Sequence, residues 1–108
     1  MYNYQAKIVK VVDGDTIDVE IDLGFDIWHK TRLRFAHIDA YEKTTEIGKQ
    51  ASKFVGDTLS KDTTYQITTY KPDKYGRYLA EIFVDGVSLN KTLVEKKFAV
   101  PYEGGKRE

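Results

Sequence analysis

The chain has 108 residues, of which 41% are hydrophobic and 31% charged, with 17 Lys and Arg against 17 Asp and Glu. This composition predicts one globular domain over residues 1–108, and the absence of any run near 20 apolar residues excludes membrane insertion. The chain has no cysteine, which excludes disulfides and thiolate chemistry, and its balanced charge argues against nucleic-acid binding through the overall field alone.

The first part of the chain predicts a three-stranded meander. Apolar and acidic residues alternate from Ile17 to Leu23, which is typical of a strand with one buried face. Residues 4–12 are also rich in β-formers, and the turn triplet Asp13-Gly14-Asp15 lies between the two segments, so residues 4–23 predict a hairpin. Residues 28–38 predict a third strand, which we expect to end in the irregular stretch Asp39-Ala40-Tyr41-Glu42.

The second part of the chain predicts two helices and two more strands. Apolar residues recur at helical spacing from Ile47 to Leu59, which predicts an amphipathic helix over residues 46–60. The other expected elements are strands at 63–71 and 78–84, a turn at 72–77 between them, a short helix that Ser88 caps and that runs to about Lys97, and a frayed, flexible tail at 103–108.

The order of these elements indicates a fold class. A mainly β domain with helices (α+β), with one helix between strands three and four and a short helix after strand five, matches the five-stranded Greek-key barrel of the OB-fold. OB-folds commonly bind oligonucleotides or oligosaccharides, but the fold alone does not fix the chemistry.

Five charged residues are candidates for chemistry. Asp15, Asp39 and Glu42 stand at strand ends or turns, where a hard cation could collect carboxylate and backbone oxygens. Arg34 and Arg77 carry guanidinium groups, which hold phosphate oxygens in a planar, bidentate geometry. Taken one by one, the acids also suit ordinary turn chemistry, and the arginines also suit surface ion pairs.

Three segments together carry a resemblance. They are Val12-Asp13-Gly14-Asp15-Thr16, Arg34-Phe35-Ala36-His37-Ile38-Asp39-Ala40-Tyr41-Glu42 and Asp73-Lys74-Tyr75-Gly76-Arg77-Tyr78-Leu79-Ala80. In this order and on these elements, the chain resembles the staphylococcal nuclease (thermonuclease) family, in a short form without the third C-terminal helix. The resemblance runs from about Ala6 to Tyr102.

The resemblance implies a calcium-dependent phosphodiesterase that hydrolyses DNA and RNA, with single strands preferred, and leaves 3′-phosphates. Calcium, which would act as a Lewis acid, is the implied cofactor, and we expect a monomer. By position, the implied calcium ligands are Asp15, Asp39 and the main-chain carbonyl of Ala40; the phosphate-clamping residues are Arg34 and Arg77; the residue that activates water is Glu42; and the other substrate-binding residues are Lys74, Tyr75 and Tyr102.

The chain also departs from the family pattern. Tyr41 stands where the family usually has proline, so the loop that carries Asp39 and Glu42 lacks a fixed φ. The stretch after Lys43 is shorter than in the type member. His37 occupies a position that is usually small or aliphatic, and we interpret it as a partly buried strand residue without a catalytic role.

Two other functions remain open at this point. The first is a non-catalytic OB-fold module that binds single-stranded nucleic acid, in which the acids and arginines would typically be replaced. The second is an OB-fold that binds a protein or a sugar, with purely structural charges. The compartment also stays open: the chain is secreted if a leader was removed, and otherwise cytoplasmic, with phage-related processing among its conceivable roles.

Overall fold

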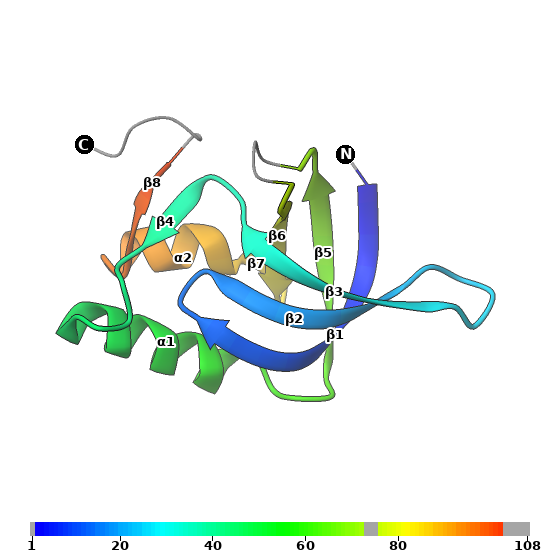
Figure 1. The fold of residues 1–108 in the computed structure, drawn as a ribbon, viewed down its shortest axis with the longest axis horizontal. Coiled ribbons are helices and arrows are strands. Elements are labelled where there is room, and N and C mark those ends of the chain that lie inside the picture. Colours follow the sequence, from blue (N-terminus) through cyan, green and yellow to red (C-terminus); the bar gives the residue numbers. More distant parts are fainter. Residues whose placement is uncertain (1, 73–75, 103–108) are drawn as a thin grey trace.

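A computed structural model describes residues 2–72 and 76–102, and Figure 1 shows how their elements are arranged. The described residues form strands β1 (Tyr2–Asp13), β2 (Thr16–Asp22), β3 (Trp28–Phe35), β4 (Ile38–Ala40), β5 (Thr64–Tyr70), β6 (Tyr78–Val84), β7 (Val87–Ser88) and β8 (Ala99–Pro101), and helices α1 (Glu46–Thr58) and α2 (Leu89–Glu95).

Five of these strands close into a barrel. β1 pairs antiparallel with β2 on one side and with β5 on the other, β2 continues to β3, and β5 continues to β6. A short parallel pairing of Leu33–Phe35 with Tyr78–Ala80 joins β3 to β6 and completes the ring. The predicted five-stranded OB-fold barrel with two helices is therefore confirmed.

The alternation seen in the sequence produces the core. Ile17, Val19 and Ile21 of β2 point inward and are at most 6% exposed, whereas the acids between them are half-buried on the outer face. The strand β1 bends around the barrel through irregularities in its pairing with β2. Packing of inward-facing side chains from β1, β2, β3, β5 and β6 fills the barrel.

The predicted single strand over residues 28–38 is wrong. β3 ends at Phe35, and His37 turns the chain with φ +67°, so β4 leaves the barrel and pairs with β8. The N–H of Ala36 donates to the Ala80 carbonyl, and the Asn90 side chain donates to the Ala36 carbonyl, so both groups are satisfied at the break. His37 is exposed in this turn and is not a partly buried strand residue, and Asp39-Ala40, expected to be irregular, is a strand.

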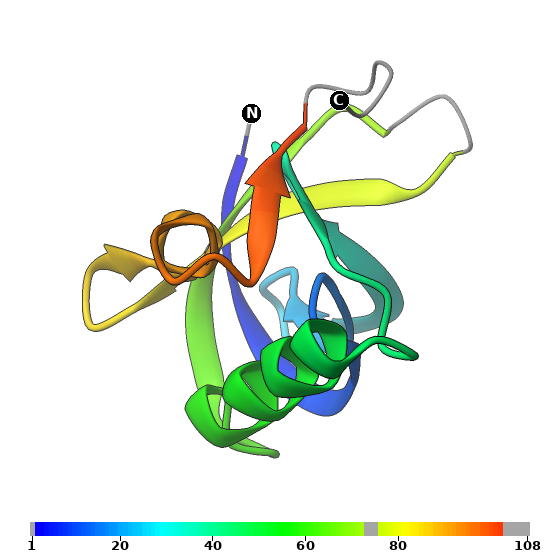
Figure 2. The ribbon, with the colours of Figure 1, turned by 90° about the vertical axis from the view of Figure 1, so that its left-hand side faces the viewer.

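The two helices lie on the outside of the barrel (Figure 2). The Thr45 hydroxyl accepts a hydrogen bond from the Gly48 N–H and caps α1, which ends at Thr58, two residues before the predicted end. Ser88 caps α2 as predicted, but this helix ends at Glu95, and Lys97 follows with φ +64°. Both helices were therefore correctly predicted, but each ends earlier in the structure than the sequence predicted.

Some predictions fall outside the described residues. They concern residues 73–75 of the expected turn, which include the predicted substrate-binding residues Lys74 and Tyr75, and the expected tail at 103–108. In the described part of the chain, no helix is long and apolar enough to cross a membrane.

Candidate active site

The turn between β1 and β2 presents a buried carboxylate. Asp15 is 8% exposed, and its Oδ2 accepts a hydrogen bond of 3.0 Å from the Ala40 N–H, while the Thr16 hydroxyl donates to its Oδ1 at 3.1 Å. The Asp15 N–H donates to Asp13 Oδ1 at 3.1 Å, which fixes the turn. This turn packs directly on β4, since a Cβ on Gly14 would lie 3.1 Å from the Ala40 Cβ.

Arg34 of β3 joins Asp15 to Asp39. The guanidinium is buried, and its Nη2 lies 2.9 Å from Asp39 Oδ1 and 3.5 Å from Asp15 Oδ2. Its Nη1 donates to the carbonyls of Phe35 and Ile38 at 3.3 and 3.0 Å, which anchors it across the break between β3 and β4. One arginine thus holds two acids that are 24 residues apart in the chain, and the predicted convergence of these three residues is observed.

The aromatic ring of Tyr102 lies beside this arginine. Arg34 Cζ is 5.8 Å from the centre of the Tyr102 ring, within the range of a cation–π contact. The Tyr102 N–H donates to the His37 carbonyl at 2.8 Å, immediately after the pairing of β4 with β8. Tyr102 is therefore positioned at the edge of the Arg34 cluster.

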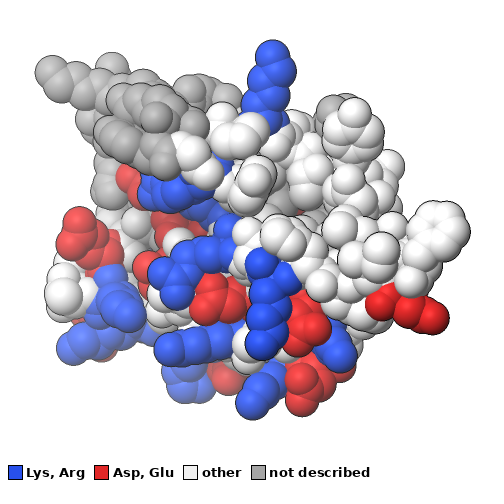
Figure 3. Space-filling view, turned by 45° about the vertical axis from the view of Figure 1, so that its right-hand side comes forward, with Lys and Arg blue, Asp and Glu red and all other residues white. Residues whose placement is uncertain are grey.

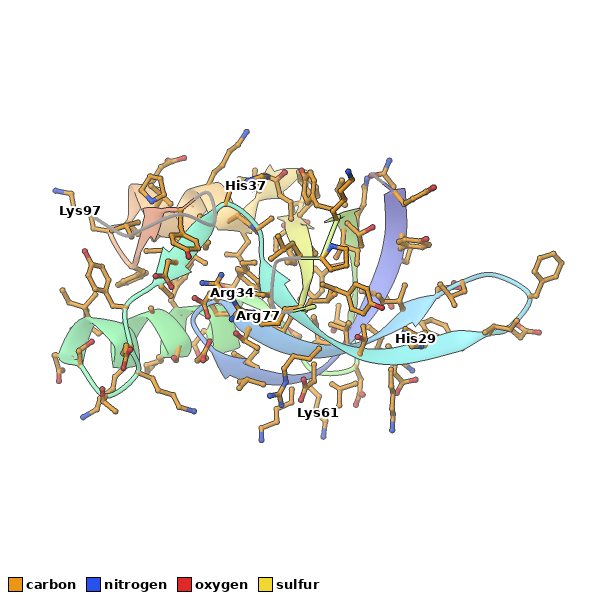
Figure 4. All side chains as sticks on the ribbon, turned by 45° about the horizontal axis from the view of Figure 1, so that its top comes forward. His29, Arg34, His37, Lys61, Arg77 and Lys97 are labelled. Carbon is orange, nitrogen blue, oxygen red and sulfur yellow. The ribbon has the colours of Figure 1, made fainter. Side chains whose placement is uncertain are left out.

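Arg77 lies next to this cluster through the strand register. It directly precedes Tyr78, which pairs with Leu33, while Leu79 pairs with Arg34 itself. Arg77 is exposed, and Figure 4 draws the two labelled guanidinium groups close together, in agreement with that register. The structure thus brings the second predicted arginine to the same edge of the barrel as the first.

The loop that carries Glu42 packs tightly against α1. The Glu42 side chain is exposed, and its carbonyl accepts hydrogen bonds from the N–H and the hydroxyl of Thr45, at 2.9 and 2.7 Å. A Cβ on Gly48 would lie 1.7 Å from the Glu42 carbonyl oxygen, so only glycine allows this close approach. Gly48 therefore sets where the loop lies, and Glu42 follows Ala40 by only two residues.

Burial changes the acidity of the turn. It raises the pKa of Asp15 to about 6, with a hydrogen bond to Asp13 acting in the same direction, although the Ala40 N–H and Arg34 act against the shift. For Asp13, burial also raises the pKa, but hydrogen bonds involving Asp15 and Thr16 outweigh it, and the pKa lies below its usual range. Asp15 is thus a carboxylate whose negative charge is poorly solvated in the metal-free protein.

The donor set of this cluster fits a hard cation. Asp15 and Asp39 supply carboxylate oxygens, and the main-chain carbonyl of Ala40 is the third predicted ligand. Such oxygens suit calcium, with water completing the shell. Asp15 and Asp39 both lie within 3.5 Å of one nitrogen of Arg34, so two carboxylates share this guanidinium, and a bound cation would offset the additional negative charge. No group of three or more acidic or histidine side chains forms a metal site among the described residues.

Sequence reasoning missed three residues that support the cluster. The Asn90 side chain is 3% exposed; it donates to the carbonyls of Ala36 and Ala80 at 3.0 Å and accepts from the Ile82 N–H, so it fixes the end of β3 against β6. Gly48 has the role described above, and Asp13 holds the Asp15 turn. Only Asp13 had a signal in the sequence, because it belongs to the Asp-Gly-Asp triplet.

Comparisons with known proteins agree with this geometry. A family model described as staphylococcal nuclease homologue matches residues 32–108. An "Uncharacterized endonuclease" of Escherichia coli O157:H7 is 33% identical over 99 residues, which cover 91% of this chain and 61% of the relative. A "Micrococcal nuclease" of Shigella flexneri is 31% identical over 81 residues, covering 75% of this chain and 43% of the relative. The chain therefore spans about three fifths of the first of these relatives and less than half of the second.

Proposed function

This chain belongs to the family of staphylococcal nuclease homologues, and from this premise we propose that it is a calcium-dependent nuclease that hydrolyses phosphodiester bonds of DNA and RNA and leaves 3′-phosphates. Its relatives support a nuclease function, and calcium, the substrates and the products are the finer parts of the proposal. The observation that carries it is the convergence of Asp15, Asp39 and Arg34 from three different elements.

The two arginines bind the reacting phosphate. Arg34 is held rigidly by the carbonyls of Phe35 and Ile38, so it keeps its orientation without substrate, whereas the Arg77 side chain is exposed to solvent. Preorganised donors stabilise the negative charge that grows on the phosphate oxygens in the transition state. Arg34 therefore supplies a fixed donor and Arg77 a more accessible one.

The three carboxylates have two proposed roles, calcium binding and activation of water. Asp15 and Asp39, with the Ala40 carbonyl, would hold calcium, which neutralises phosphate charge and acts as a Lewis acid when bound. Glu42 is exposed on the neighbouring loop, where its carboxylate orients or deprotonates the attacking water. Lys74, Tyr75 and Tyr102 would hold the rest of the nucleotide, and of these Tyr102 lies beside Arg34.

A cleavage assay tests the proposal. The protein is incubated with an end-labelled single-stranded oligonucleotide in calcium or in a chelator, and the new ends are tested for 3′-phosphate with a phosphatase that removes it. Cleavage in calcium alone, with 3′-phosphate ends, is the expected result. Binding of the oligonucleotide without cleavage in either condition would instead identify a non-catalytic OB-fold module.

A further inference from the structure

The barrel is open at the start of β3. Residues 28–34 of β3 pair with β2, but only Leu33, Arg34 and Phe35 pair with β6. Among the described residues, no strand of this sheet therefore lies on the other side of residues 28–32. A groove of about 310 Å³ lies at this opening, between the start of β3 and the ends of β1, β5 and β6. Its floor includes Ile21 and Leu33 from the barrel core.

Aromatic rings dominate the walls of this groove. Four tyrosines and a histidine line it, together with Pro72: they are Tyr2, Tyr4, Tyr70, Tyr78 and His29. Tyr2 is 69% exposed and Tyr78 is 50% exposed, so both rings offer a face to a ligand. The Tyr2 and Tyr4 rings lie 6.4 Å apart, and the Tyr70 hydroxyl donates to Glu81, which holds that ring in place.

The groove is also free of acidic groups. None of its described lining residues is Asp or Glu, although the whole chain carries 17 acids. In Figure 3, charged side chains crowd the lower half of this face, and an uncharged region occupies its upper right. A polyanion would therefore meet no like charge from the groove walls.

Two lining residues of the groove are direct neighbours in the chain of the two arginines at the proposed catalytic edge. Leu33 lines the groove and the next residue is Arg34, and in the same way Tyr78 lines the groove and the preceding residue is Arg77. We propose that this groove, the Tyr groove, binds the bases of a single-stranded nucleic acid whose phosphate lies at Arg34 and Arg77. This inference rests on the proposed function for the identity of the ligand.

Stacking supplies the physical basis. Sequence-tolerant proteins hold single strands by stacking bases on aromatic rings beside cationic groups, because every base has a π-face. The exposed rings of Tyr2 and Tyr78 provide such platforms without a fixed set of hydrogen-bond partners for any one base. The Tyr groove therefore predicts tighter binding of longer single strands without strong sequence preference.

A binding experiment tests this inference independently of cleavage. The affinity of a fluorescent 8-nucleotide DNA is measured by anisotropy in a chelator at low salt, for the wild type, Tyr78→Ala, Tyr78→Phe and Tyr2→Ala. We expect Tyr78→Ala and Tyr2→Ala each to weaken binding about tenfold, the scale of one lost stacking contact, and Tyr78→Phe to bind like the wild type. Thermal unfolding of each variant checks that the fold is intact.

Two controls separate stacking from other causes. Phe25 is 96% exposed and does not line the groove, so Phe25→Ala should bind like the wild type. An abasic version of the same DNA should bind the wild type and Tyr78→Ala equally, because it has no base to stack. The inference would be overturned if Phe25→Ala weakened DNA binding as much as Tyr78→Ala does. It would also be overturned if Tyr78→Ala weakened the binding of abasic DNA as much as that of intact DNA.

Other outcomes distinguish the two proposals. Cleavage in calcium with unchanged binding by both alanine variants would leave the nuclease in place and overturn the Tyr groove. Weakened binding by these variants without any cleavage would support the groove and remove the nuclease. A wild-type dimer that Tyr78→Ala converts to a monomer would show that a second copy of the chain fills the groove, which also overturns the inference.

Discussion

The two ends of β3 differ in almost every physical respect. At its C-terminal end, β3 is paired on both sides, Phe35 is fully buried, and Arg34 makes contacts with two carboxylates and two carbonyls. At its N-terminal end, Trp28 is 43% exposed, and within the described part of the chain it pairs with β2 alone. One strand therefore supports a rigid charged cluster at one end and an open aromatic groove at the other.

The difference shows how closure of the barrel divides binding from chemistry. A buried arginine is stable only where every donor has a partner, and those partners are available where β3, β4 and β6 meet. An aromatic platform must instead keep its ring faces exposed, which requires an opening between strands. Changes at the closed end should therefore have large effects on stability or turnover, and changes at the open end small ones.

The largest expected effect is on the free energy of unfolding, and it compares a large side chain at each end of β3. Phe35→Ala should lower the free energy of unfolding by about 3–5 kcal/mol, because it leaves a cavity in a closed part of the barrel. Trp28→Ala should cost no more than about 1 kcal/mol, since the ring is partly exposed and its described contact is with Lys7 at 5.2 Å. Urea unfolding of both variants measures the loss of free energy of unfolding. Similar losses in the two variants would contradict the difference between the two ends of β3.

The next effect concerns turnover. Arg77→Ala should reduce the cleavage rate about 10²–10³-fold, the usual cost of removing one preorganised donor. Arg32→Ala is the matched control, because the Arg32 side chain is 62% exposed and pairs with Asp18 on the outer face. It should change the rate less than about threefold, which corresponds to a surface ion pair. Equal losses in the two variants would indicate a general loss of positive charge instead.

Two glycines of α1 test the loop that carries Glu42. Gly48→Ala should destabilise the protein by about 3 kcal/mol and reduce cleavage, since the new Cβ would overlap the Glu42 carbonyl and displace the loop. Gly56→Ala meets nothing within 4 Å on the same helix and should stabilise it by up to about 1 kcal/mol. Thermal unfolding and cleavage rates measure both, and a neutral Gly48→Ala would contradict the close packing.

The smallest effect is the pH dependence of stability. The folded protein raises the pKa of Asp15 to about 6, so it binds this proton more tightly than the unfolded chain does. The stability of the calcium-free protein should therefore fall by up to about 2 kcal/mol as the pH rises from about 4 to 6. The lowered pKa of Asp13 acts below this window. In Asp15→Asn, urea unfolding should show a much smaller decline of the free energy of unfolding over this pH range. An unchanged decline would show that another group causes it.

The sequence was sufficient for the features that depend on local patterns. Alternation from Ile17 to Leu23 predicted the barrel strand, and helical spacing predicted α1. The acids and arginines of the cluster were found because their residue types suit calcium and phosphate, and the resemblance fixed their order along the chain.

The missed features depend on contacts between distant residues. The break at His37 arises because β4 pairs with β8, a strand of three residues some 60 positions later that has little signal of its own. In the sequence, Asn90 resembles an ordinary helix residue, and its role becomes visible only from the hydrogen bonds that its side chain donates to the carbonyls of Ala36 and Ala80. Gly48 would be judged unfavourable for a helix, and its value appears only where the Glu42 loop crosses it.

A comparison of two glutamates tests the central claim most directly. Glu42→Gln and Glu46→Gln remove the same charge from exposed positions four residues apart, one on the loop beside the cluster and one in the first turn of α1. Single-turnover cleavage of labelled single-stranded DNA in calcium should slow about 10²–10³-fold for Glu42→Gln and less than about twofold for Glu46→Gln. Near wild-type cleavage by Glu42→Gln, or equal losses in the two variants, would contradict the claim that the closed end of β3 is the catalytic centre.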